Sequence, residues 1–260
     1  MYFLKILVRQ SIKLLGNSLK LGCLMIHLMA PNARFTLPKH SKAWWRTSHL
    51  SKIPRVIWQT NFTDRVTLAV YLNYLFNRFM APSFEYRFIV KEERRVFISG
   101  TFGPEITRLY DQLQIGAAQA DFWRVLVLQK FGGLYLDIDA HFVWPAGYLI
   151  TPHLEELFIQ IKTGEISNYF IASKPQNPNL ALVIEEIASG ISAGANNDVY
   201  SLTGPGVFNR VLKKADIPTS YYAYTVNQGN FTNEFFQYID KPQGKWTKEQ
   251  HKVSVLKPPQ

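Results

Sequence analysis

The chain has a single cysteine, Cys23, so no intramolecular disulfide bond can form within its 260 residues. This excludes small domains held together by disulfides, and it is typical of a protein from a reducing compartment. Internal repeats and low-complexity segments are also missing, which excludes repeat arrays. With 47% hydrophobic residues, a chain of this length buries a substantial core. We therefore expect one folded domain.

Acidic residues are absent from the first 63 positions of the chain. This stretch holds ten basic residues, whereas the remainder carries 19 basic and 19 acidic residues, so the whole net charge of +10 comes from the N-terminal segment. If residues 3–21 form a helix, its four basic residues lie within an arc of roughly 80° and its leucines lie largely on the other side. A basic amphipathic helix of this kind predicts binding to an anionic membrane surface through residues 1–30.

Other interpretations of the N-terminal segment stay open. The helix could pack on the rest of the protein with its basic face in solvent, or it could be a secretory signal whose apolar core Lys13 and Lys20 interrupt. The apolar run at residues 21–30 is too short to span a bilayer. We expect a peripheral protein on the cytoplasmic face of a membrane. We expect no nucleic-acid partner, because no nucleic-acid-binding motif accompanies the basic residues.

The rest of the chain alternates between strand-like and helix-like segments. Strand-like runs cover residues 56–59, 84–90, 134–138 and 169–172, and helix-like runs cover residues 65–79, 104–113, 119–130, 180–189 and 207–214. This alternation predicts an α/β fold with a mostly parallel central sheet. We expect two parts, an N-terminal membrane-associating segment of residues 1–50 and an α/β domain of residues 51–260.

The most informative stretch runs from Gly132 to Ala140 and reads Gly-Gly-Leu-Tyr-Leu-Asp-Ile-Asp-Ala. Its two glycines permit a sharp turn from a helix into a strand. On an extended strand, Tyr135, Asp137 and Asp139 point to one face. Two carboxylates on one face of an apolar strand need a cation, basic partners or solvent. Carboxylate oxygens are also ligands for a divalent cation, so the pattern indicates a metal site.

A helical segment precedes this stretch. The run from Gly116 to Phe131 has apolar residues at helical spacing and carries Asp121 and Arg124 three residues apart, on neighbouring parts of one surface. Helix, turn and strand therefore bring an acid, a base, an aromatic ring and the paired aspartates toward one region. The alternative for Asp121 and Arg124 is an intrahelical salt bridge with no further role.

An aspartate pair with one residue between fits three kinds of site. It can be an exposed strand end, the nucleophile site of a haloacid-dehalogenase-type phosphatase, or the metal site of a nucleotide-sugar glycosyltransferase. In the phosphatases the pair lies near the start of the domain and is usually followed by Thr or Val. Here Ala140 and His141 follow, and the pair lies in the middle of the chain. The context favours the glycosyltransferase.

The segment Asp121-x-x-Arg124 followed by Phe131 to Asp139 resembles the signature of glycosyltransferase family 32, the glycosyltransferase sugar-binding region containing the D-x-D motif. Three further segments resemble the family in the same order: residues 53–60, residues 168–173 with Asn177-Pro178 after them, and residues 202–205. The resemblance implies a GT-A-like nucleotide-sugar-binding fold.

The resemblance also implies roles for individual residues. Asp137 and Asp139 resemble the family's ligands of Mn²⁺ or Mg²⁺, and Asp137 would also contact the donor ribose or sugar. Asp121 and Arg124 resemble the pair that orients the donor sugar, with Arg124 able to reach a phosphate oxygen. Asp137, Asp139 and Arg124 are therefore the expected catalytic residues.

Four neighbouring residues have two interpretations each. Trp58 resembles the aromatic residue that stacks on the donor base, or it is an ordinary core residue. Tyr135 binds the donor sugar or phosphate, or it packs beneath the site. Asn168 contacts the sugar or is a turn residue. His141 is a third metal ligand or a structural histidine.

The implied activity is that of a metal-dependent hexosyltransferase. It would move a sugar from a nucleotide-diphosphate sugar to a glycan or lipid-linked glycan, with retention of anomeric configuration, in bacterial surface polysaccharide synthesis (capsule or lipopolysaccharide). A D-x-D phosphatase and a non-catalytic membrane- or glycan-binding module remain as alternatives. On the acceptor side, Trp246 and His251 match only loosely the His and Trp cluster that the family often has near its C-terminus.

Overall fold

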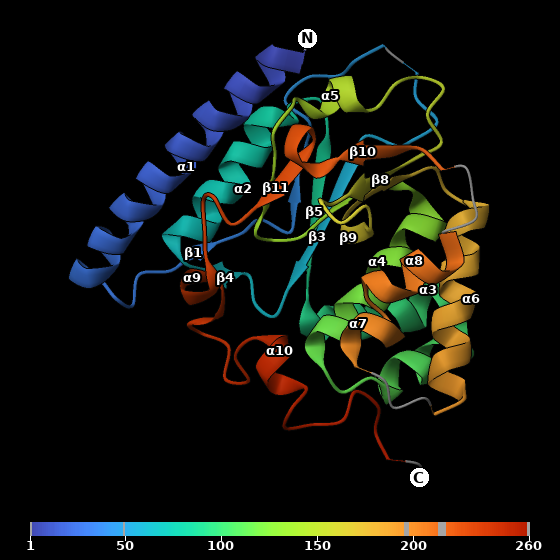
Figure 1. The fold of residues 1–260 in the computed structure, drawn as a ribbon. Helices are drawn as coiled ribbons and strands as arrows, with labels where there is room; N and C mark the ends of the chain where they lie inside the picture. Colours follow the sequence, from blue (N-terminus) through green and yellow to red (C-terminus); the bar gives the residue numbers. More distant parts are fainter. Residues whose placement is uncertain (1, 49, 195–197, 213–216, 259–260) are drawn as a thin grey trace.

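The computed structural model describes residues 2–48, 50–194, 198–212 and 217–258 (Figure 1). Its helices are α1 (Tyr2–Met29), α2 (Leu68–Met80), α3 (Lys91–Gln112), α4 (Gly116–Phe131), α5 (Ala146–Leu149), α6 (Pro178–Ser192), α7 (Val199–Leu202), α8 (Pro205–Leu212), η1 (Tyr222–Tyr224), α9 (Glu234–Tyr238) and α10 (Trp246–Glu249). Its strands are β1 (Phe35–Thr36), β2 (His40–Ser41), β3 (Val56–Asn61), β4 (Arg65–Val66), β5 (Glu85–Val90), β6 (Gly133–Leu136), β7 (Ala140–Phe142), β8 (Glu156–Gln160), β9 (Ile166–Ser173), β10 (Thr219–Tyr221) and β11 (Val226–Gln228).

A seven-stranded sheet in the order β10-β8-β9-β6-β3-β5-β2 forms the centre of the domain. Strands β6, β3 and β5 are mutually parallel, and β8 and β10 are parallel to each other. Strand β9 is antiparallel to both of its neighbours, and β2 is antiparallel to β5. All strands except β9 and β2 therefore run in one direction, which confirms the predicted α/β fold with a mostly parallel sheet.

Helices cover both faces of this sheet (Figure 1). Helices α3, α4, α6, α7 and α8 pack on one face, where α4 is central because Phe122, Trp123, Val125 and Leu128 are all fully buried. Helix α2 packs on the other face, and α1 lies outside α2. This is the expected layered arrangement of an α/β domain.

Several element boundaries differ from the sequence-based prediction. Helix α3 begins at Lys91 and runs past a kink at Gly103, where φ is 81°, so the predicted helix at 104–113 is only its second half. Strand β4 occupies the start of the predicted helix at 65–79. Helix α8 ends at Leu212 within the described chain, and the rest of the predicted helix at 207–214 lies outside the described residues.

The turn between α4 and β6 requires both of its glycines. Gly132 and Gly133 have φ angles of 65° and 107°. A Cβ atom on Gly133 would lie 2.6 Å from the carbonyl oxygen of Val56, and one on Gly132 would lie 2.7 Å from Cδ of Pro175. The predicted helix-to-strand turn is confirmed, because no other residue fits here.

The sheet topology defines one polar edge. Strands β3, β5 and β6 are parallel, so Asn61, Lys91 and Asp137 emerge at the same edge of the sheet. Strand β9 runs the opposite way, so its first residues, up to Asn168, reach this edge as well. In open α/β sheets, ligands bind at the carboxyl ends of the strands.

Helix α1 has the predicted two-sided pattern but the opposite orientation. Lys5 and Arg9 lie over the rings of Trp144 and Tyr222, which belong to the domain. The buried residues Ile12, Gly16 and Cys23 share this inner side. The alternative of a helix packed on the domain is right about the packing, since α1 contacts α2 and η1. Its expectation of a basic face in solvent is wrong for Lys5, Arg9 and Lys20, which contact the domain, whereas Lys13 is exposed.

The outer face of α1 is apolar. Twelve large hydrophobic residues of this helix are exposed: Phe3, Leu4, Leu7, Leu14, Leu15, Leu19, Leu21, Leu24, Met25, Ile26, Leu28 and Met29. The helix is continuous over the run at 21–30 that sequence analysis took as too short to span a bilayer. By length and composition, Phe3–Met29 is able to cross a membrane.

Candidate active site

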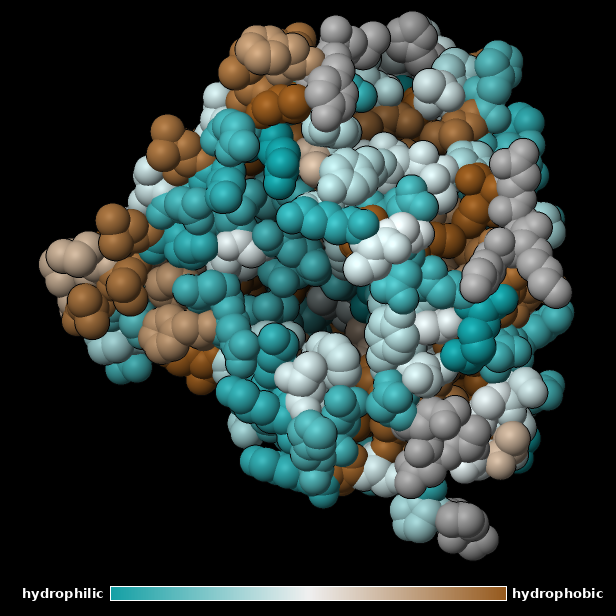
Figure 2. All heavy atoms as spheres, viewed as in Figure 1, coloured by the Kyte–Doolittle hydropathy of each residue, from teal (hydrophilic) through white to brown (hydrophobic). Residues whose placement is uncertain are grey.

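A cavity of about 520 Å³ opens at the polar edge of the sheet. Figure 2 shows a hollow with mostly hydrophilic walls on this face of the molecule. One wall carries the residues predicted from the signature: Asp121, Arg124, Tyr135, Asp137, Asp139 and Asn168. The opening is covered in part by the segment from Gln228 to Trp246, and residues at the starts of α3 and α4 also line the cavity.

We call the wall formed by Asp121, Arg124, Tyr135, Asp137, Asp139 and Asn168 the signature wall. Arg124 lies at its centre. Its Nη2 atom lies 2.8 Å from Oδ1 of Asp121 and 3.3 Å from Oδ1 of Asp137. Its Nη1 atom donates to the carbonyl oxygen of Asn168 at 2.6 Å, and the guanidinium stands 4.3 Å from the centre of the Tyr135 ring. Arg124 therefore joins α4, β6 and β9, and the interpretation of a purely intrahelical salt bridge is wrong.

Asp121 is held on both carboxylate oxygens. Asn168 donates to Oδ1 at 3.0 Å and Thr203 donates to Oδ2 at 3.3 Å. Burial raises the pKa of Asp121 to about 6, although the Arg124 guanidinium acts in the opposite direction. Asn168 lies inside β9 and not in a turn, so its role in the structure is to fix Asp121 and Arg124.

The paired aspartates do not lie on an extended strand. Strand β6 ends at Leu136, and the amide of Ala140 donates to the carbonyl oxygen of Asp137 at 3.0 Å, which closes a turn. The expected strand alternation through Asp139 is therefore wrong. The turn still directs Asp137 and Asp139 to the same cavity, and the Tyr135 hydroxyl donates to Oδ1 of Asp137 at 2.7 Å.

Asp139 is held by the C-terminal cover of the cavity. Gln228, at the end of β11, donates from Nε2 to Oδ1 of Asp139 at 3.1 Å, and the Gly229 amide donates to the Asp139 carbonyl oxygen at 3.2 Å. Burial and the neighbouring Asp137 raise the pKa of Asp139 to about 7. Two neighbouring carboxylates repel each other, and a cation bound by both would relieve this repulsion and could also bind an anionic ligand.

The aspartate pair suits a metal that shares its ligands with a substrate. Among the described residues, no group of three or more His, Cys, Asp or Glu side chains is placed to hold a metal ion. Mg²⁺ typically binds through one or two carboxylates together with substrate phosphates and water. Asp137 and Asp139 match this donor set, so the residues present fit Mg²⁺ or Mn²⁺ bound with a diphosphate.

His141 does not belong to this set. It is fully buried, its Nε2 atom lies 3.0 Å from Nδ2 of Asn230, and the rings of Phe76 and Phe231 lie against it. Burial lowers its pKa to about 3, and the charge of Lys20 adds to this effect. His141 is a neutral core residue, and the interpretation as a third metal ligand is wrong.

Trp58 does not line the cavity either. Its indole N–H donates to the carbonyl oxygen of Gly132 at 3.0 Å, and its ring packs among Phe97, Trp123 and Phe131 beneath β6. The predicted stacking of Trp58 on a donor base therefore disagrees with the structure. The aromatic residue that lines the cavity beyond the end of β3 is Phe62.

Two lysines of the C-terminal segment line the cavity and were not identified from the sequence. Lys241 pairs with Glu249 at 3.1 Å, and Lys245 pairs with Glu234 at 3.3 Å. Trp246 lines the cavity, but His251 is exposed outside it. The basic and aromatic composition of this C-terminal segment was the available signal, but nothing in the sequence fixed its position over the cavity.

The cavity wall contributed by α3 was also missed. Lys91 and Arg94 line the cavity from the first turn of this helix. Arg94 is only 2% exposed, and no carboxylate within the described part of the chain lies at ion-pair distance from it. The run Lys91-Glu92-Glu93-Arg94-Arg95 looks like a solvated helix face, which is why it gave no signal.

A comparison with protein families matches the part of the chain that forms most of the signature wall. Residues 45–158 match the model of the glycosyltransferase sugar-binding region containing the DXD motif. This confirms the predicted family resemblance over the part of the chain that carries Asp121, Arg124, Asp137 and Asp139. Strand β3 also falls within the matched region.

Two curated relatives and one solved structure are similar. The initiation-specific alpha-1,6-mannosyltransferase of Schizosaccharomyces pombe is 29% identical over 120 residues, 44% of this chain and 28% of that protein. An uncharacterized glycosyltransferase of Acanthamoeba polyphaga mimivirus is 41% identical over 56 residues, 22% of each chain. The structure of the PaToxG glycosyltransferase superimposes with a TM-score of 0.54 at 18% identity, over 83% of this chain and 80% of that one.

These similarities agree with the predicted fold and enzyme class. The superposition shows that the chain has the fold of a solved glycosyltransferase, as predicted. The family model and both relatives are also described as glycosyltransferases, in agreement with the predicted enzyme class. The chain spans about a quarter of the length of the curated relatives it matches.

Proposed function

We propose that this protein is a glycosyltransferase that moves a sugar from a nucleotide-diphosphate sugar to a hydroxyl group. The observation that carries the proposal is one hydrogen-bonded unit on the cavity wall, formed by Asp121, Arg124, Tyr135 and Asp137 beside Asp139. Such a unit presents carboxylates, guanidinium N–H groups and an open cavity to one ligand. In a sugar diphosphate, the hydroxyl groups can bind the carboxylates and the phosphate oxygens can bind the guanidinium. Its size suits the cavity.

Asp137 and Asp139 would hold Mn²⁺ or Mg²⁺ together with the two phosphates of the donor. When bound, the ion acts as a Lewis acid that stabilises the negative charge of the leaving diphosphate. Tyr135 and Arg124 both contact Oδ1 of Asp137 and fix the orientation of this carboxylate. Gln228 does the same for Asp139.

Asp121 and Arg124 would orient the donor sugar. The guanidinium of Arg124 is a rigid fork of N–H donors, and its contacts with Asp121, Asp137 and Asn168 keep it in one position before any ligand arrives. A sugar hydroxyl or a phosphate oxygen at the cavity wall is then recognised with little reorganisation.

We further propose that transfer retains the anomeric configuration by front-face attack. The bond between the anomeric carbon and the diphosphate oxygen breaks, the bond to the acceptor oxygen forms on the same face, and the acceptor proton passes to the leaving phosphate. The chain need supply no nucleophile in this scheme. In support, both oxygens of Asp121 accept hydrogen bonds from Asn168 and Thr203, which leaves this carboxylate poorly placed for attack.

The two rival functions fit the site less well. A phosphatase would use Asp137 as a free nucleophile, but Tyr135 and Arg124 occupy its Oδ1 atom. A non-catalytic binding module would have no need for a second carboxylate in the turn at Asp139.

The test is a panel of nucleotide sugars assayed for transfer and for slow hydrolysis, each with Mn²⁺, with Mg²⁺ and with EDTA. We expect turnover of at least one sugar diphosphate with metal and none with EDTA. p-Nitrophenyl phosphate is the control for the phosphatase. Metal-dependent release of its phosphate, with no nucleotide sugar consumed, would overturn the proposal.

A second proposal concerns the membrane. We propose that α1 lies in the surface of a bilayer with its apolar outer face among the lipids and its inner face packed on α2 and η1. Figure 2 shows hydrophobic residues along the margin formed by this helix. Three of its four basic residues contact the domain, so the attachment is hydrophobic more than electrostatic.

This arrangement supports attachment to a membrane, and we propose that the protein is peripheral on the cytoplasmic face. An enzyme held there would meet a glycan or lipid-linked glycan as acceptor, and we propose a role in bacterial surface polysaccharide synthesis. The single cysteine is compatible with a reducing compartment.

Vesicle sedimentation at low and high salt tests the attachment. We expect binding to persist at high salt and to be lost in the variant Leu14→Ser, Leu21→Ser and Leu28→Ser. The control carries the same change at three exposed apolar residues outside α1: Val96, Leu182 and Val253. Loss of binding by salt alone would show that the basic residues carry the attachment, as the sequence pattern indicated.

A further inference from the structure

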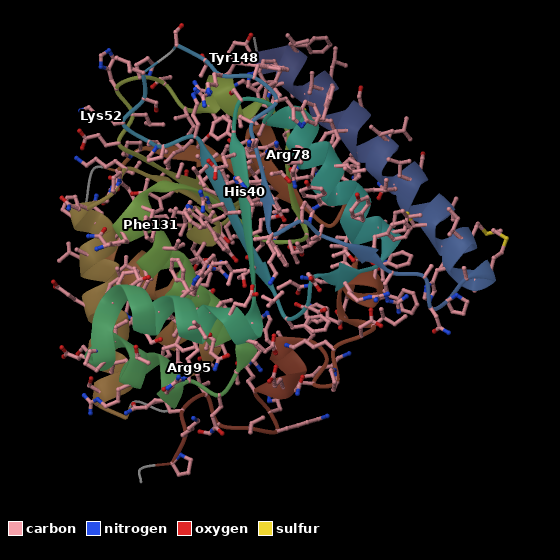
Figure 3. The ribbon with its side chains drawn as sticks, turned by 180° about the vertical axis from the view of Figure 1, so that it is seen from behind. His40, Lys52, Arg78, Arg95, Phe131 and Tyr148 are labelled. Atoms are coloured by element: carbon pink, nitrogen blue, oxygen red, sulfur yellow. The ribbon has the colours of Figure 1, made fainter. Side chains whose placement is uncertain are left out.

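Arg94 differs from the other two deeply buried arginines of the described chain. Arg124 has carboxylate and carbonyl partners, and Arg78 donates to the carbonyl oxygens of Phe84 and Lys42, both at 2.7 Å. Arg78 is visible on α2 in Figure 3. Arg94 is equally buried at 2% exposure but has one long hydrogen bond, 3.4 Å from Nη1 to the carbonyl oxygen of Gly116.

A second donor of Arg94 has no partner within the described chain. Its Nε atom is buried and has no hydrogen-bond partner, and no carboxylate of the described chain lies within ion-pair distance. Burial lowers the pKa of Arg94, although the nearby Tyr110, Tyr135 and Glu92 act in the opposite direction. A buried guanidinium without a counter-charge costs several kcal/mol of folding free energy. A bound ligand that accepts hydrogen bonds from Arg94 would offset this cost.

The cavity is where that group would bind. Arg94 lines it together with Lys91 from the same helical turn, and with Gly116 and Ala117 at the start of α4. The first N–H groups of α3 and α4 have no intrahelical partners, so both helix ends favour an electron-rich ligand. Phe62 adds an aromatic surface to this part of the wall.

This inference rests on the proposed donor. Phe62 and Arg94 line the same cavity as Asp137 and Asp139, beyond the ends of β3 and β5, so a nucleoside attached to a diphosphate at the two aspartates can extend toward them. We propose that Arg94 recognises the nucleobase of the donor by donating N–H hydrogen bonds to the carbonyl oxygen at C4 of a pyrimidine or C6 of a purine. Uracil (O4) and guanine (O6) carry such an acceptor. Cytosine and adenine carry an amino group at the corresponding position, which cannot accept a hydrogen bond from a guanidinium.

Two size-matched pairs of nucleotides test this recognition. Binding of UDP against CDP, and of GDP against ADP, is measured by titration calorimetry with Mn²⁺ present, on the full chain. We expect the wild type to prefer, in at least one pair, the nucleotide with a carbonyl at C4 or C6, that is UDP over CDP or GDP over ADP. In Arg94→Met this preference should fall by about 10- to 100-fold, as expected for hydrogen bonds from a charged donor.

Arg95 offers a matched control. It is the neighbouring residue on α3, is exposed, and pairs with Asp111 at 2.7 Å on the outer side of the helix (Figure 3). Arg95→Met should leave the base preference unchanged. Arg94→Lys keeps the charge but not the fork, so it should lose most of the preference while the protein stays folded.

A thermal readout separates recognition from a structural role. Because Arg94 has no carboxylate partner and only one long hydrogen bond within the described chain, Arg94→Met should leave Tm unchanged or raise it, whereas loss of a structural residue would lower it. An unchanged base preference in Arg94→Met would overturn the proposal. An equal loss for all four nucleotides would also overturn it, because it would place Arg94 on the phosphates. If the wild type binds no nucleoside diphosphate, the proposed function itself fails.

Discussion

Two walls of the same cavity carry a buried arginine each, and they are built differently. On the wall formed by α4, β6 and β9, Arg124 is held by Asp121, Asp137 and Asn168. On the wall formed by α3, Arg94 has a single long hydrogen bond. The residue type and the depth of burial are the same, but the partners are not.

The difference separates two uses of a buried charge. Where the chain supplies the counter-charge, the arginine fixes the geometry of the site and also stabilises the fold. Where the chain supplies none, the unmet hydrogen bonds are left for a ligand. The first kind of residue is expected to cost both stability and activity when changed, and the second to cost binding alone.

The largest effect is expected from Asp139→Asn, on the signature wall. Transfer should fall by about 100-fold or more, because one of the two carboxylates for the metal loses its charge. Thermal stability should be kept, since Asp139 is in a partly exposed turn. Steady-state transfer assays and a melting curve measure both. Asp111→Asn, at a half-buried acid outside the cavity, is the control. Activity equal to the wild type would contradict the metal site.

Arg124→Ala is expected to reduce transfer and stability together. The change leaves Asp121 buried without its positive partner, which costs about 3–5 kcal/mol by analogy with other broken buried pairs. Chemical denaturation gives the free energy, and transfer assays give the rate. A variant with normal stability and low activity would show that Arg124 serves the donor only, and that the comparison between the two walls is misplaced.

The pH dependence of stability sharpens the same comparison. The pKa of Asp121 is raised to about 6 in the folded protein, above its ordinary value of 3.8, so the folded state binds this proton more tightly than the unfolded state. This group therefore adds stability below pH 4 and loses that contribution as pH rises through 6, by up to about 3 kcal/mol. Denaturation at pH 4.5 and 7.5 should show a smaller fall for Asp121→Asn than for the wild type. If the free energy of unfolding falls equally in the wild type and in Asp121→Asn, the raised pKa of Asp121 is refuted.

The smallest effect is expected from Lys20→Met in α1. The Nζ atom of Lys20 donates to the carbonyl oxygen of Gly229 at 2.8 Å, and the amide of Gly229 donates to the backbone of Asp139. Removing this brace should lower transfer by about two- to fivefold, as expected for one hydrogen bond of modest net strength. Lys13→Met, on the exposed side of the helix, should change nothing. Equal rates for both variants would show that α1 and the cavity are independent.

The signature wall was predictable because its parts are local in sequence. The Gly132-Gly133 turn, the strand after it and the helix before it can be placed from spacing and backbone geometry alone. Asp121, Arg124, Tyr135 and Asp137 then follow, since helix and strand meet across a short turn.

The remaining parts depend on contacts between distant segments. Gln228 reaches Asp139 only because β11 pairs with β7, and short strands of three residues leave no clear periodicity. The position of Trp58 was predicted wrongly because the sequence of a strand does not show whether a tryptophan on it packs in the core or faces a ligand. The orientation of α1 was reversed because cation–π contacts and a buried carbonyl compensate its basic residues, which an amphipathic pattern does not reveal.

The central claim is that Asp137 and Asp139 hold a divalent metal together with the diphosphate of a nucleotide. Pulsed electron paramagnetic resonance on Mn²⁺, with a bound nucleoside diphosphate, tests it most directly. The account predicts hyperfine coupling to phosphorus in the wild type and its loss in Asp139→Asn. Mn²⁺ that shows no coupling to phosphorus in the wild type, or equal coupling in both proteins, would contradict it.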